Sequence, residues 1–245
     1  MDFYDELQSQ PPWRRVGWRF AIEQAYRNEA AIDLIRTTTG TVVDVGWGIG
    51  GLSEYVAAYG LQRDVVGIES RQQLAVQVPH EVICADYAEV DLRAECAVAI
   101  GTLSAGSQLR SLLQFLADTA PCFVATVLDA DGLRARPLLW AEHGDAAVTR
   151  ADVSATGVAA EVSQLTPTDL LVARGAPPKS MRERFLQTLD GPWSSRFDAT
   201  ERAWLAVELQ LWEDAERWLE EAPRGDERAD LLREGVALLR DVAER

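Results

Sequence analysis

The sequence predicts an α/β protein with a mostly parallel sheet and helices on both of its faces. Short apolar runs, often rich in valine and isoleucine, alternate with helix-like segments between residues 41 and 128. Such alternation is typical of β–α–β units, which build parallel sheets covered by their crossover helices. A glycine-rich turn follows the first of these runs, and a largely helical tail ends the chain.

Five strands are predicted in the first half of the chain, with helices between them. The strands span residues 41–45, 65–68, 82–85, 96–100 and 121–128. The helices span 18–36, 52–59, 72–78 and 108–117, the last with leucines along one face.

The pattern changes after residue 128. Residues 138–140 and 146–148 are interpreted as short paired segments, and 157–162 and 169–173 as two further strands that complete a seven-stranded sheet. Helices are expected at 180–189, 199–221 and 226–243, separated by proline and glycine. We interpret this tail as a plain helical appendage, although one stretch resembles half of a tetratricopeptide unit.

Charge and cysteine content exclude several classes of function. The 245 residues carry a formal net charge of −15, which disfavours DNA or RNA as a partner because acidic surfaces repel phosphate backbones. Neither a secretory signal nor a run of about 20 apolar residues is visible, so we expect a cytoplasmic protein without a membrane partner. Cys84, Cys96 and Cys122 lack the spacing of a zinc site and are expected in the core.

The glycine-rich turn has the sequence Asp-Val-Gly-Trp-Gly-Ile-Gly over residues 44–50, between a strand and a helix. Glycines permit a tight turn and let the backbone approach a ligand closely. The turn alone is ambiguous, because Gly51 also supplies the G-x-G-x-x-G spacing of nicotinamide-binding proteins.

Three carboxylates make the site more specific, because each lies at the carboxyl end of a predicted strand. Asp44 lies inside the end of the first strand, Glu69 follows the second, and Asp86 follows the third. Open α/β sheets bind ligands at this edge. An acid after the second strand can accept both ribose hydroxyl protons of a nucleoside, and one after the third can accept from an adenine amino group.

With these residues, the region from 41 to 128 resembles the class I (Rossmann-like) S-adenosylmethionine-dependent methyltransferases. The resemblance implies a seven-stranded Rossmann-like sheet, S-adenosyl-L-methionine as cofactor and S-adenosyl-L-homocysteine as product. The family has cysteine or a small residue where this chain has Trp47. The implied cofactor-binding residues are Asp44, Gly46, Trp47, Gly48, Gly50, Glu69, Ser70, Asp86, Tyr87, Gly101 and Thr102.

Upstream of the glycine loop, the chain resembles the N-terminal lid helices of small-molecule methyltransferases. The residues proposed for this lid or the substrate are Tyr4, Trp18, Arg19 and Arg27. Arg19 or Arg27 is a candidate for the cofactor carboxylate, and the alternative is a surface ion pair with Glu23. The resulting division is a lid at 1–36, a cofactor-binding core at 37–175 and a helical segment at 176–245.

His143 is the candidate catalytic base, because imidazole can take a proton near neutral pH. The alternative is an exposed loop histidine. No metal is expected, since the carboxylates near the fourth strand, Asp91 and Glu95, precede it. The loop after that strand lacks the Asn/Asp-Pro-Pro-Tyr/Phe element with which related enzymes methylate amides or base amino groups.

The sequence therefore predicts methyl transfer to an oxygen or nitrogen of a small molecule. One alternative is a peptide or protein methyltransferase that docks its partner on the C-terminal helices. Another is a non-catalytic interaction module in which the Trp47 side chain fills the cofactor's space. The tryptophan-rich C-terminal helices also offer a face for a homodimer.

Overall fold

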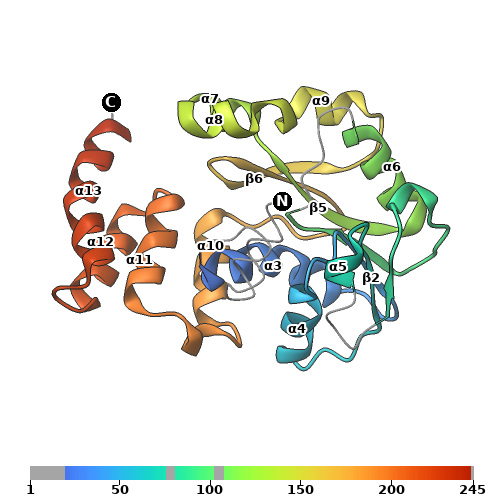
Figure 1. The fold of residues 1–245 in the computed structure, drawn as a ribbon, viewed down its shortest axis with the longest axis horizontal. Helices are drawn as coiled ribbons and strands as arrows, with labels where there is room; N and C mark the ends of the chain where they lie inside the picture. Colours follow the sequence, from blue (N-terminus) through green and yellow to red (C-terminus); the bar gives the residue numbers. More distant parts are fainter. Residues whose placement is uncertain (1–19, 76–80, 102–107, 244–245) are drawn as a thin grey trace.

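The computed structural model describes residues 20–75, 81–101 and 108–243 (Figure 1). These residues contain a seven-stranded sheet with the order β3-β2-β1-β4-β5-β7-β6. Strands β1 to β5 are parallel, whereas β7 and β6 are antiparallel to their neighbours, so the prediction of a mostly parallel seven-stranded sheet is confirmed. The strands are β1 Val42–Val45, β2 Val65–Ile68, β3 Val82–Ile83, β4 Cys96–Ala99, β5 Cys122–Leu128, β6 Glu161–Thr166 and β7 Asp169–Arg174.

Strand register aligns the ends of the strands along one edge of the sheet. Val42 is the partner of both Val65 and Cys96, so β1, β2 and β4 begin together and end together. Leu128, the last residue of β5, pairs with Asp169, the first residue of β7. Because β7 runs the other way, its first residue lies at the edge where the parallel strands end.

Helices cover both faces of the sheet, as predicted (Figure 1). Alternate residues of β1 point to opposite faces: Val42 belongs to the core cluster that contains α3, and Val43 to the cluster that contains α6. The helices of the first half are α3 Ala21–Ile35, α4 Gly51–Ala58, α5 Gln72–Ala75 and α6 Leu109–Thr119. Of the three cysteines only Cys96 is fully buried, and Cys84 is exposed, so the expectation of three core cysteines is wrong.

The region after β5 differs from the prediction. Residues 138–140, expected to pair as a strand, lie in helix α8 Pro137–His143, which begins at a proline in a favourable first-turn position. Of residues 146–148, only Val148 makes an isolated bridge, to Asp129. Two short helices, α7 Ala130–Arg134 and α9 Arg150–Ala155, were not predicted. Apolar runs of three residues are too short to distinguish a strand from a helix by periodicity.

The sixth strand lies later than predicted. It spans 161–166 rather than 157–162, because its pairing with β7 across the turn at residues 167–168 sets its position. Pairing of this kind depends on the partner strand and is not encoded within the segment itself.

The C-terminal part contains α10 Met181–Asp190, α11 Ala199–Glu208, α12 Trp212–Glu221 and α13 Glu227–Ala243. The single helix predicted over 199–221 is wrong, because Gln210 adopts a left-handed backbone conformation with φ of 59°. There the Leu211 N–H donates to the Ala206 carbonyl at 2.8 Å, which closes α11 with a Schellman-type turn.

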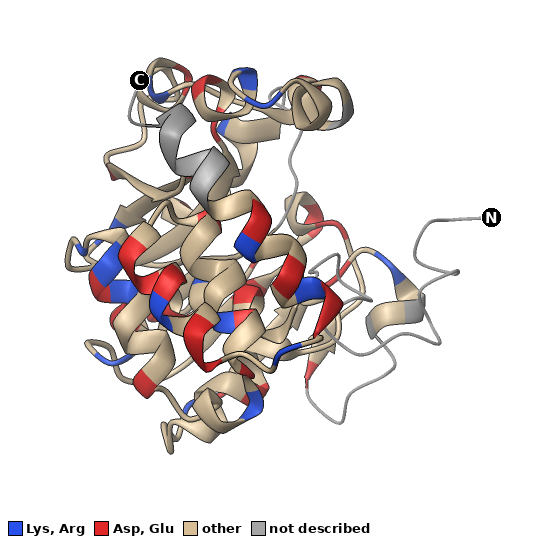
Figure 2. Ribbon diagram, turned by 90° about the vertical axis from the view of Figure 1, so that its left-hand side faces the viewer, with Lys and Arg blue, Asp and Glu red and all other residues tan. Residues whose placement is uncertain are grey.

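The C-terminal helices also contribute to the main core. Phe185 of α10 and Leu205 of α11 pack in the same cluster as α3. Acidic and basic residues are interspersed over the C-terminal helices that face the viewer in Figure 2. Within the described ranges, no helix is both long and apolar enough to cross a membrane.

Candidate functional site

The glycine loop at residues 46–50 joins β1 to α4 and has a backbone that requires glycine. Gly46, Gly48 and Gly50 have φ of 79°, 56° and 79°, a region that residues with a Cβ rarely adopt. Gly50 directly precedes the first turn of α4, so the loop leads straight into the amino end of that helix. The sequence prediction of a strand–turn–helix at this position is confirmed.

Glu69 ties the loop to the second strand. Its carboxylate accepts a hydrogen bond from the Gly48 N–H at 2.9 Å through Oε2, and one from the Arg71 N–H at 3.0 Å through Oε1. The side chain is buried, yet it lines the cavity described below. A carboxylate has about four acceptor positions, so two backbone bonds leave capacity for a ligand.

Asp44 is the last residue but one of β1 and is 5% exposed. Burial, assisted by the negative charge of Glu69, raises the pKa of Asp44 to about 8. Its carboxyl group is therefore largely protonated at neutral pH in the protein without ligand. A cation placed beside it would favour ionisation, because an opposite charge stabilises the carboxylate.

The Trp47 side chain packs against two glycines and does not fill the cavity described below. A Cβ on Gly67 would lie 2.4 Å from ring atoms of Trp47, and one on Gly50 would lie 2.9 Å from the same ring. The indole is 3% exposed and belongs to the core cluster that includes α3. The large side chain thus packs against the Cα of Gly67 in β2 and leaves a cavity open above the loop.

This cavity has a volume of about 360 Å³, within the usual range of about 300–1,000 Å³ for small-molecule sites. It lies at the carboxyl ends of β1 to β4 and unites most of the cofactor residues predicted from the sequence. The residues among its lining that were predicted are Asp44, Gly46, Trp47, Gly48, Glu69, Ser70, Asp86, Tyr87 and Gly101.

Asp86, Tyr87 and Gly101 are each held in place by local contacts. The exposed Asp86 carboxylate caps a short helical turn by accepting from the Ala88 N–H at 2.9 Å. Tyr87 is half-buried and packs on Phe115, with 5.5 Å between ring centroids. The N–H of Gly101, whose φ is 70°, donates to Thr126 Oγ1 at 2.8 Å.

The structure adds polar residues that the sequence analysis missed. Gln24 and Asn28 of α3 and Gln108 before α6 also line the cavity. Gln24 and Asn28 are one helical turn apart, at a spacing that places both on one side of the helix. The spacing of these two amides along the predicted helix was the only signal that the sequence offered.

Arg27, a predicted lid or substrate residue, lies outside the cavity lining. Its guanidinium donates to Asp169 at 2.7 Å and lies 3.5 Å from Glu208, in an ion cluster between α3, β7 and α11. Burial alone would lower the pKa of Arg27, but the two carboxylates raise it. Arg27 is 6% exposed, so a surface ion pair is ruled out, and it does not line the cavity.

Among the remaining predicted residues that the structure describes, Gly50 and His143 do not line the cavity. His143 is the last residue of α8, which packs beside α7 and lies apart from α4 and α5 (Figure 1). It is not among the cavity residues, and its role as a base stays a prediction. Tyr4, Trp18, Arg19 and Thr102 fall outside the described residues. Within the described ranges, no three His, Cys, Asp or Glu residues are grouped so as to hold a metal.

No protein-family model matches the chain, and no curated protein matches its sequence. Solved structures do match. The PH0226 protein from Pyrococcus horikoshii OT3 has a TM-score of 0.54 at 14% identity, over 72% of this chain and 100% of that chain. The plantazolicin methyltransferase BpumL, in complex with a pentazolic desmethylPZN analog and SAH, has a TM-score of 0.51 at 15% identity, over 90% of this chain and 89% of its own.

A second structure of BpumL with SAH gives the same TM-score of 0.51 at 14% identity, over 90% of both chains. SAH is S-adenosylhomocysteine, the demethylated form of S-adenosylmethionine. At these identities the likeness establishes the fold. The chain has the fold of the class I methyltransferases, as the resemblance of its glycine loop implied.

Proposed function

We propose that this protein transfers a methyl group from S-adenosylmethionine to an oxygen or nitrogen atom of a small molecule. One observation carries the proposal: a single cavity combines the glycine loop with Glu69, which follows the second strand, and Asp86, which follows the third. This combination suits a nucleoside ligand at the edge where open α/β sheets bind ligands.

Five of the predicted cavity residues have a role in this proposal. Glu69 accepts from the ribose hydroxyls while its backbone hydrogen bonds hold the loop against the ligand. Asp86 accepts a hydrogen bond from the adenine amino group, and the Tyr87 ring contacts the adenine. Asp44 faces the cationic part of the cofactor, and Gly101 lines the methionine part. Once bound, the cofactor supplies a methyl group already activated by a sulfonium, so the protein's main contribution is positioning and exclusion of water.

A small-molecule acceptor is supported by two observations. The acidic chain has no Asn/Asp-Pro-Pro-Tyr/Phe element after its fourth strand. BpumL, which shares the fold, binds a desmethylPZN analog together with SAH. The peptide or protein alternative gains no specific support. The non-catalytic alternative is weakened, because Trp47 packs against Gly67 rather than filling the cavity.

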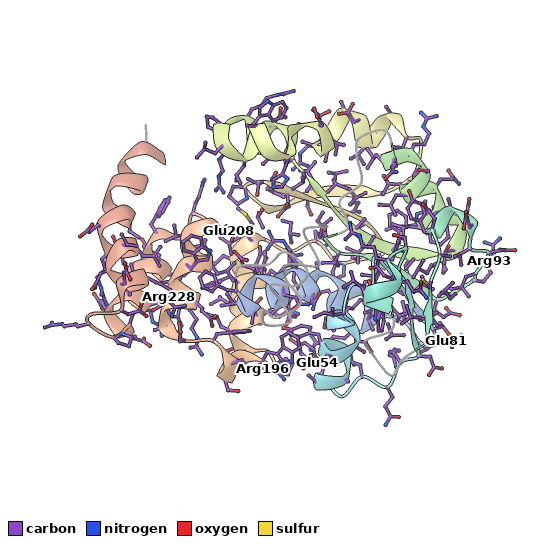
Figure 3. The ribbon with its side chains drawn as sticks, viewed as in Figure 1. Glu54, Glu81, Arg93, Arg196, Glu208 and Arg228 are labelled. Atoms are coloured by element: carbon purple, nitrogen blue, oxygen red, sulfur yellow. The ribbon has the colours of Figure 1, made fainter. Side chains whose placement is uncertain are left out.

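Isothermal titration calorimetry with S-adenosylmethionine, S-adenosylhomocysteine and NAD tests the proposal. We expect both adenosyl amino acids to bind in the micromolar range and NAD to bind far more weakly. Glu69→Gln keeps the shape of the side chain but replaces one acceptor by a donor, and should weaken binding at least about tenfold, as expected for a charged hydrogen bond. The matched control is Glu81→Gln at the amino end of β3, away from the cavity (Figure 3).

Two results would overturn the assignment. Wild-type protein that binds neither adenosyl compound at millimolar concentration would refute the methyltransferase proposal. Binding that Glu69→Gln leaves unchanged would refute the ribose role of Glu69 alone. Thermal unfolding of each variant checks that the loop and sheet remain folded.

A further inference from the structure

Asn28 is a buried amide whose donor has no partner within the described part of the chain. The residue is 3% exposed, and its Nδ2 makes no hydrogen bond there. It nevertheless lines the cavity beside the glycine loop. Buried amide donors are nearly always hydrogen-bonded, so a donor of this kind facing a cavity indicates a ligand group that accepts from it.

Gln24 lies one helical turn before Asn28 and faces the same cavity. A Cβ on Gly51 would lie 1.9 Å from Gln24 Nε2, so the amide rests directly on the backbone of the first residue of α4. The two amides of α3 therefore border the side of the cavity formed by the amino end of α4. N–H groups at a helix amino end attract negative groups, which makes this side suitable for a carboxylate.

Of the two cationic residues proposed for this role from the sequence, Arg19 falls outside the described residues and Arg27 is engaged in another cluster. Arg27 lies between Asn28 and Gln24 in sequence, but its guanidinium contacts Asp169 and Glu208. Asn28 and Gln24 thus present neutral donors to the cavity from a helix whose arginine points to another cluster.

We propose that Asn28, supported by Gln24, binds the carboxylate of the cofactor's amino-acid part and so determines selectivity for cofactors that carry this group. The inference rests on the proposed function and adds a specificity-determining residue to it. The carboxylate accepts from Asn28 Nδ2, while Asp44, on the same cavity, is available to the ammonium group. Asn28 acts in binding and takes no part in the chemistry at the methyl group.

Calorimetry with two ligands tests this inference. S-adenosylhomocysteine has the amino-acid part, whereas 5′-methylthioadenosine has the same nucleoside and thioether without it. We expect Asn28→Ala to weaken S-adenosylhomocysteine about tenfold, the usual loss for one hydrogen bond to a charged group, and to leave methylthioadenosine unchanged. Asn28→Asp should be worse than Asn28→Ala for S-adenosylhomocysteine, because it places a negative charge beside the carboxylate.

The outcomes separate the two proposals. If Asn28→Ala weakens the binding of both ligands equally, Asn28 has a merely structural role. If the binding of both ligands is unchanged, Asn28 has no role in binding. Either result overturns the inference and leaves the methyltransferase assignment intact. Wild-type protein that binds neither ligand would overturn the proposed function and this inference with it. Glu69→Gln, which faces the ribose, is the control that should weaken both ligands together.

Discussion

Replacing Asp44 by asparagine is expected to raise the free energy of unfolding of the ligand-free protein, by an amount that grows with pH. The carboxyl group is 5% exposed, and burial raises its pKa from an ordinary value of 3.8 to about 8. Between these two values the folded protein holds a proton that the unfolded chain has lost. The stabilising contribution of the group is therefore complete below pH 3.8 and is lost progressively as the pH rises to about 8.

The size of the effect follows from the same two values. At pH 7 the solution lies just over three pH units above the ordinary pKa, and each unit corresponds to about 1.4 kcal/mol, which gives a penalty of about 4 kcal/mol. Asparagine has nearly the shape of a protonated aspartic acid and no proton to lose. Asp44→Asn and wild type should therefore have similar stability near pH 4, and the variant should be more stable by up to about 4 kcal/mol at pH 7.

Urea unfolding followed by tryptophan fluorescence at pH 4, 5.5, 7 and 8 measures this difference directly. Titrating groups that both proteins share cancel when the two are compared at each pH. Asp91→Asn, a change at an exposed carboxylate, is the control and should show no growing difference. A stability difference for Asp44→Asn that stays constant with pH, or a variant less stable than wild type at pH 7, would refute the reasoning. The same variant should bind S-adenosylmethionine more weakly, since it cannot become an anion.

Two further predictions concern the buried ion cluster of Arg27 and the packing of Trp47. Arg27→Met leaves Asp169 and Glu208 without their cation and should lower the free energy of unfolding by about 3 kcal/mol at pH 8, measured by urea denaturation. The loss should be smaller at pH 6, because burial raises the pKa of Glu208 to about 7 even though Arg27 lowers it. Gly67→Ala places a methyl group 2.4 Å from the Trp47 ring and should cost about 1–3 kcal/mol, with a smaller cost when Trp47 is also replaced by leucine.

A specific experimental result would contradict each of these two predictions. A loss for Arg27→Met that is equal at pH 6 and pH 8 would mean that Glu208 does not titrate against the arginine. If Gly67→Ala costs the same with tryptophan or leucine at position 47, the glycine is needed for another reason than the indole. Thermal unfolding and a double-mutant cycle provide both comparisons.

The sequence by itself determined the features that depend on neighbouring residues. The apolar runs of β1 to β5 and their intervening helices could be predicted because strand and helix periodicities are local. The glycine loop could be predicted because its positive φ angles require residues without a Cβ. Glu69 and Asp86 followed from their positions at strand ends, since parallel strands end along one edge.

Only the tertiary structure decided the features that depend on residues far apart in the chain. Arg27 and Asp169 are 142 residues apart, and no local pattern showed that the arginine would be paired rather than face the cofactor. From the sequence, the Trp47 side chain could have filled the cofactor's space, but its packing against Gly67 places the indole in the core. No local pattern singled out Asn28, and only the packing of α3 beside the glycine loop buries this residue at the cavity. In each case, burial by a distant segment decides whether a polar or bulky side chain contacts the protein or the ligand.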